Sequence, residues 1–138
     1  MPVMNANAYM YDDPEIIDID TVSLDDLLQM RQFSLILMDI EGSEYFALKG
    51  MQKILAGSKA LSVEFLPYHL RDVANVEILD FINTILPHFE WMYIPRYNSI
   101  FEKAEISKKV EEMYRAGECH EGIYFLKKLP QDWLKERG

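Results

Sequence analysis

The stretch from residue 33 to residue 50 constrains the fold of this chain more than any other. It begins with an apolar run, FSLILM, and then turns abruptly into acid and glycine, DIEG, before a helix-period segment begins. A continuous apolar run that ends at a glycine turn is typical of a strand buried on both faces, inside a parallel sheet. Ligands of such sheets bind just beyond the carboxyl ends of the strands, which is where Asp39 and Glu41 stand.

Strand patterns and helix patterns alternate along the rest of the chain, and this alternation is the signature of an α/β fold. The expected strands cover residues 16–22, 33–39, 60–66, 89–94 and 122–126. The expected helices cover residues 23–31, 43–56, 73–86 and 102–116. Ser23 and Asp26 have the spacing of an acidic variant of the capping box, and Gly50 indicates close backbone packing within the second helix.

The totals indicate one domain and exclude several classes of protein. The 138 residues carry 14 Lys and Arg against 23 Asp and Glu, so the formal net charge is −9. Such an acidic chain is a poor ligand for nucleic acid, which binds clustered Lys and Arg. Cys119 is the single cysteine, so the chain can form no internal disulfide, which suits the reducing cytoplasm. No apolar run approaches the roughly 20 residues of a membrane helix, and no secretion signal is visible. We expect a cytoplasmic protein with an arm at 1–15, a domain at 16–128 and a tail at 129–138.

The segment MDIEGSEYFALKGMQKIL resembles the central signature of the FkbM-type methyltransferases, whose pattern is an apolar strand, Lys-Ile-Asp-x-Glu-Gly-x-Glu and a Leu-x-Gly helix. The resemblance covers residues 16 to 66, and Met38 departs from it where the family usually has lysine. It implies a Rossmann-like methyltransferase sheet, mostly parallel with the last two strands antiparallel, and helices on both faces. It also implies S-adenosylmethionine as cofactor, bound near Asp39, Ile40 and Gly42.

One part of the family pattern is not found in this sequence. The family binds its cofactor mainly through a glycine-rich turn after its first strand, and none of the six glycines here forms such a turn near the start. We therefore expect the chain to hold only the second, catalytic-side half of the sheet. In that arrangement the strand at 33–39 lies at an edge.

Three carboxylates, those of Asp39, Glu41 and Glu64, stand at predicted strand ends and are the candidate catalytic groups. Together they could hold a hard cation such as Mg²⁺, or one of them could act as a general base with a raised pKa. No metal ligands are assigned from the sequence. The alternative is structural, with Asp39 and Glu41 capping the following helix. Glu64 resists that explanation because an unpaired charge inside an apolar strand is costly.

Histidine and cysteine add one further candidate. His69 follows the second strand in the loop Pro67-Tyr68, so it could line the same site as a catalytic residue. The adjacent pair Cys119-His120 has no third partner and is a weak signal for a nucleophile. The loop from Pro95 to Ser99, with Arg96 and Tyr97, could shape an acceptor pocket.

Two classes of function follow from these observations, with a third held as a weaker alternative. The first is an S-adenosylmethionine-dependent methyltransferase that acts on a hydroxyl of a sugar or other small molecule. The second is a non-catalytic remnant that serves as an interaction or dimerisation module, because an unpaired apolar edge strand at 33–39 favours association with a second copy or a partner chain. The third is a metal-dependent hydrolase built on the carboxylates.

Overall fold

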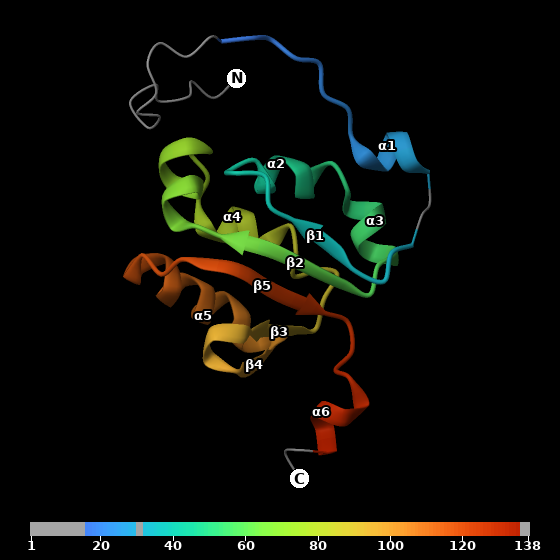
Figure 1. Cartoon of the computed structure of the whole chain (residues 1–138), viewed down its shortest axis with the longest axis vertical. Coiled ribbons are helices and arrows are strands. Elements are labelled where there is room, and N and C mark those ends of the chain that lie inside the picture. Colours follow the sequence, from blue (N-terminus) through green and yellow to red (C-terminus); the bar gives the residue numbers. More distant parts are fainter. Residues whose placement is uncertain (1–15, 30–31, 136–138) are drawn as a thin grey trace.

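The fold is built on one open, mixed β-sheet. The computed structural model describes residues 16–29 and 32–135, and within them five strands pair in the order β1-β2-β5-β3-β4 (Figure 1). The strands are β1 (Ile36–Met38), β2 (Ala60–Phe65), β3 (Trp91–Ile94), β4 (Ser99–Glu102) and β5 (His120–Leu126). The predicted arm at 1–15 and the predicted end of the first helix at 30–31 lie outside the described residues. The strand predicted at 33–39 does lie at an edge of the sheet, but it covers only Ile36–Met38. The expectation that it is buried on both faces is wrong, because its one described neighbour leaves Leu37 72% exposed.

The direction of the strands corrects the prediction of a mostly parallel sheet. Only β1 and β2 are parallel neighbours, whereas β5 runs antiparallel to both β2 and β3, and β4 runs antiparallel to β3. The turn at Pro95–Tyr97 is too short for a parallel crossover, so β4, which the sequence did not predict, folds back on β3. The expected antiparallel pair of 89–94 and 122–126 is confirmed. Because β1, β2 and β3 share one direction, their carboxyl ends meet at the same edge.

The helices are shorter and more numerous than predicted. They are α1 (Leu24–Leu28), α2 (Glu44–Lys49), α3 (Gln52–Gly57), α4 (Ile78–Asn83), α5 (Lys103–Ala116) and α6 (Gln131–Lys135). A π-helix also covers His69–Val73. The helix predicted at 43–56 is divided at Gly50, and only α5 has the predicted length. It ends at Ala116, and the next residue, Gly117, has a φ of +66°, a value that favours glycine.

One face of the sheet holds the core. The strand residues on this face, such as Val63 and Phe125, pack with buried side chains of α2, α3, α4 and α5 in a single cluster. On the opposite face Leu37 is 72% exposed, and the ring of Trp133 from α6 contacts Tyr93. The expectation of helices on both faces is therefore met only by α6 in the described part of the chain.

The segment at 16–22 does not form the predicted strand. It has no regular secondary structure, and Ile17 and Ile19 are 69% and 72% exposed. Its alternation of acid and β-branched residues is compatible with a strand. A strand also needs a neighbouring strand to pair with, and alternation does not show that one is present. The neighbour of β1 in the sheet is β2, and no described strand pairs with the other edge of β1.

A set of hydrogen bonds, here called the clasp, joins the start of α1 to the break between α2 and α3 at Gly50. The clasp fixes these helices over the core. The Ser23 hydroxyl donates to the Gly50 carbonyl at 2.8 Å, and the Asp25 amide donates to the same oxygen at 2.9 Å. The Asp25 carboxylate accepts the backbone amides of Lys53 and Ile54 at 2.9 and 3.0 Å, so it caps α3. The predicted capping box of Ser23 with Asp26 is wrong because the Ser23 hydroxyl is used in this clasp. The predicted approach of a neighbouring backbone to Gly50 is confirmed by these hydrogen bonds. A Cβ at residue 50 would lie 3.5 Å from the Ser23 Cα, which is an ordinary contact, so packing does not exclude a side chain there.

The clasp yields a test with a matched control. We expect Asp25→Ala to lower the free energy of unfolding by about 1 kcal/mol, because two amides of the first turn of α3 lose their acceptor. Asp26→Ala removes the same charge from an exposed neighbour and should change stability by less than about 0.5 kcal/mol. Urea denaturation followed by circular dichroism measures both. Equal effects of the two substitutions would contradict the role given to Asp25.

Candidate active site

The predicted site residues gather where β1 and β2 end. Glu41 comes from the turn after β1, Glu64 from the end of β2, and His69 from the first position of the π-helix. One side-chain ligand atom from each of these three residues lies within 4.8 Å of the other two. Asp39 follows β1 directly, and its carboxylate lies near enough to Glu64 to help raise the Glu64 pKa. The structure thus brings together Asp39, Glu41, Glu64 and His69, while their catalytic roles remain a prediction.

A glycine turn holds this cluster together. Glu41 has a φ of +53° and Gly42 a φ of +101°, so the backbone here is in the region that favours glycine. A Cβ at residue 42 would lie 3.1 Å from Val73 Cγ1 and 3.5 Å from His69 Cβ. The absence of a side chain at Gly42 therefore lets the turn pack directly on the π-helix that carries His69.

Glu44 stabilises the same turn from inside. It is only 4% exposed, and its carboxylate accepts the backbone amides of Ile40 at 3.1 Å and Gly42 at 2.9 Å. The structural role that the sequence left open for several acids is thus filled by Glu44. The amides of Ile40 and Gly42 are occupied by this contact, so the predicted cofactor contacts of these residues would have to use other atoms.

Glu64 is the most perturbed acid of the cluster. Burial, together with the nearby carboxylates of Asp39, Glu41 and Glu44, raises the pKa of Glu64 to about 7. Its Oε2 atom is buried and has no hydrogen-bond partner in the described structure. Glu64 therefore differs from a surface glutamate, since burial and like charge both disfavour its ionised form.

His69 connects the acids to the π-helix. Its Nε2 atom lies 3.7 Å from a Glu41 carboxylate oxygen, and its side chain is 12% exposed whereas that of Glu41 is 74% exposed. The neighbouring Tyr68 ring packs edge-on against the imidazole at 4.3 Å between centroids. The Nδ1 atom is buried and has no partner among the described residues. Packing thus holds the imidazole beside Glu41, although no residue spacing in the sequence required this approach.

A hollow of about 630 Å³ opens on the second face of the sheet, next to the cluster. Asp39 belongs to both, because it lines the hollow and approaches Glu64. The residues that line the hollow are Leu37, Met38, Asp39, Ser62, Pro95, Arg96, His120, Glu121, Gly122 and Tyr124. Pro95 and Arg96 of the loop after β3 line this hollow, while the expected role of that loop in binding an acceptor stays a prediction. Tyr97 instead packs on the His120 ring.

The sequence did not identify the part of this hollow that comes from β2 and β5. Ser62 and Tyr124 face each other in register on the second face, and a Cβ on Gly122 would lie 3.2 Å from the Ser62 hydroxyl. The available signal was a small residue within each of two apolar segments, Ser62 in one and Gly122 in the other. This signal could not be interpreted before β2 and β5 were known to be neighbours.

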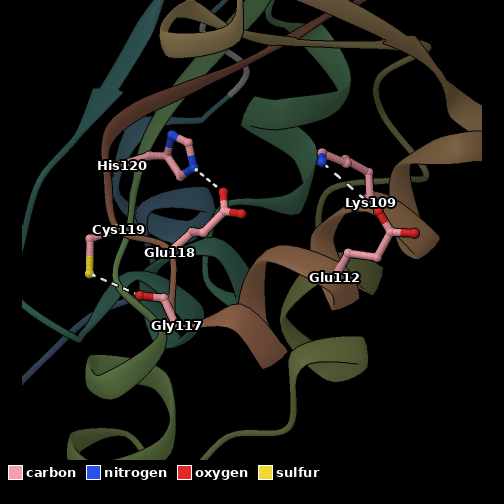
Figure 2. A network of polar contacts seen from close by, with 6 residues as sticks. All are labelled: Lys109, Glu112, Gly117, Glu118, Cys119 and His120. Carbon is pink, nitrogen blue, oxygen red and sulfur yellow. Dashed lines mark hydrogen bonds and ion pairs between the residues drawn. The ribbon is translucent and has the colours of Figure 1, made fainter.

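The pair Cys119-His120 does not form a nucleophile dyad. Figure 2 shows the two side chains pointing apart, with the Cys119 thiol near the Gly117 carbonyl at 3.7 Å and the His120 imidazole near Glu118 at 3.4 Å. His120 is 3% exposed, and burial lowers its pKa. Its position is explained by packing between the rings of Phe65 and Tyr97.

The raised pKa of Glu64 predicts the pH dependence of stability. A carboxyl whose pKa rises on folding binds more protons in the folded chain, so its contribution falls as pH increases from about 4.5 to about 7. Glu64→Gln removes this penalty. We expect the melting temperature of the variant to exceed that of the wild type at pH 8 and to be nearly equal to it at pH 4. A chelator in the buffer keeps bound cations from affecting this comparison. A variant that is less stable than the wild type at pH 8 would mean that an unrecognised partner stabilises the charged form.

Comparison with known proteins identifies the family of this chain. In the described residues no helix has both the length and the apolar character needed to cross a membrane. Neither a curated protein nor a solved structure gives a significant match. The sequence model of the Methyltransferase FkbM domain matches residues 3–98 of the 138-residue chain, which extends the similarity on both sides of 16–66. The chain therefore belongs to the FkbM methyltransferase family.

Proposed function

We propose that this chain is an S-adenosylmethionine-dependent methyltransferase domain that methylates a hydroxyl of a sugar or other small molecule. The observation that carries the proposal is the position of Asp39, which lies at the carboxyl end of β1 between the acidic cluster and the hollow. Ligands of α/β sheets bind at such ends, and a volume of about 630 Å³ is within the range of small-molecule sites. Family membership supplies the reaction type.

The residues around Asp39 fit both ligands in chemistry. Carboxylates accept hydrogen bonds from hydroxyl and ammonium groups, which suits the ribose and amino group of the cofactor and the hydroxyl of an acceptor. The cationic side chain of Arg96 lines the other side of the hollow and could orient an acidic or polar acceptor. The Ile40 and Gly42 amides donate to Glu44, so in this site side chains rather than those amides would bind ligand.

The proposed mechanism needs little from the protein beyond position and one proton acceptor. When bound, S-adenosylmethionine would supply a methyl group attached to a sulfonium, whose sulfur would be released as a neutral thioether. Asp39 would accept the hydroxyl proton of the acceptor as the carbon–oxygen bond forms.

Calorimetric titration of the purified chain with S-adenosylmethionine tests the proposal. We expect saturable binding in the micromolar range for the wild type and binding weaker by about tenfold or more for Asp39→Asn, since a hydrogen bond to a charged group is lost. Asp80→Asn, at an exposed position of α4, is the matched control and should bind like the wild type. Absence of heat with the wild type would contradict cofactor binding by this chain.

A second candidate function, self-association, is favoured by the edge of β1. The strand has one described neighbour, and Leu35 and Leu37 beside the open edge are 45% and 72% exposed. An edge strand with unpaired backbone groups can pair with a second copy of itself about a two-fold axis. We therefore propose that a second copy of the chain covers β1.

Light scattering after size-exclusion chromatography tests this contact. We expect the mass of a dimer for the wild type and a shift to monomer for Leu37→Lys, because a charge would be placed in the apolar contact. Leu79→Lys, which changes an exposed leucine of α4, should leave the mass unchanged. A wild type that remains monomeric at all concentrations tested would refute the proposal.

A further inference from the structure

The acids of the active site have properties that the proposed methyl transfer does not explain. Asp39 is sufficient as a proton acceptor, yet Glu41, Glu64 and His69 also converge with their ligand atoms within 4.8 Å of one another. The contact between the His69 imidazole and the Glu41 carboxylate explains why these two side chains lie together. It leaves the buried Glu64 Oε2 without a partner.

We propose that Glu41, Glu64 and His69 are the ligands of a divalent transition-metal ion. The three side chains come from three separate elements. The turn at Gly42 packs on the π-helix so closely that a Cβ at residue 42 would crowd Val73, and this packing holds two of these elements against each other. Such convergence at a rigid turn is the arrangement that a metal site requires. A bound cation would also give the orphaned Glu64 oxygen a partner and offset the like charge around it.

The geometry needs only a small closure. Metal–oxygen and metal–nitrogen distances are about 2.0–2.2 Å, so ligand atoms around one ion lie about 3–4 Å apart. The present separations reach 4.8 Å at most, and the 74% exposed Glu41 side chain has the freedom to rotate inward. Three protein ligands leave coordination positions for water or for an acceptor oxygen.

The ligand set also indicates which ion is expected. Imidazole together with two carboxylates suits Mn²⁺, Fe²⁺ or Zn²⁺, whereas Mg²⁺ and Ca²⁺ prefer oxygen ligands alone. Metal-bound histidines usually donate their second ring nitrogen to a partner, and no described residue fills this role at His69 Nδ1. We therefore expect moderate rather than very tight affinity. A role of the ion in catalysis rests on the proposed methyl transfer, but its binding does not.

Titration of the chelator-treated chain with Mn²⁺, without S-adenosylmethionine, tests the site directly. The signal of free Mn²⁺ in electron paramagnetic resonance measures binding. We expect one saturable site in the wild type, weakened by about tenfold or more in Glu64→Gln and in His69→Gln. Mg²⁺ should compete poorly. Glu112→Gln removes an exposed carboxylate of α5 outside the three ligands and should bind like the wild type.

Two results would overturn the inference. One is the absence of saturable binding at millimolar Mn²⁺, and the other is unchanged affinity in Glu64→Gln. If His69→Gln does not fold, as judged by circular dichroism, Glu64→Gln alone decides. Because no cofactor is present in this titration, a chain that binds Mn²⁺ but not S-adenosylmethionine would separate the metal site from the proposed function.

Discussion

The buried carboxylate of Glu44 is the contact on which the arrangement of the site depends. By accepting the amides of Ile40 and Gly42, it closes the turn that follows β1 and directs the next residues into α2. A buried carboxylate with two amide donors is well satisfied, so this turn is firmly specified. The closed turn then packs on the π-helix through Gly42. Because Glu44 accepts these amides, the carboxylates of Asp39 and Glu41 are not needed to stabilise the turn and can take part in ligand binding or catalysis.

Much of this site could be predicted because its residues lie where apolar strands stop. The strands predicted at 33–39 and 60–66 were evident from their apolar runs, and the parallel pairing of the observed strands, β1 and β2, places Asp39 near Glu64. His69 follows β2 after only a few residues, so its approach to the same edge was a reasonable expectation. The approach of the His69 imidazole to Glu41 depends on the π-helix, which has no clear sequence signal.

The errors have physical causes that a single sequence does not reveal. The segment at 16–22 alternates like a strand, but pairing is a property of two segments, and none of the described strands pairs with it. The helix pattern at 43–56 continues through Gly50 although the backbone breaks there, because the break is stabilised by Ser23 and Asp25 from a distant position. The floor of the hollow escaped prediction because it combines β2 with β5, which are separated by two other strands in the sequence.

The central position of β5 has a consequence for how the molecule is assembled. Ala60 pairs with Leu126, and Trp91 pairs with the same residue from the other side, so β5 is the link between the β1-β2 pair and the β3-β4 hairpin. Before β5 docks, these two units share no strand pairing. Contacts between residues so distant in sequence raise the contact order and slow folding. A chain still emerging from the ribosome could therefore form the acidic turn early, but the floor of the hollow would be completed only when the last strand is inserted.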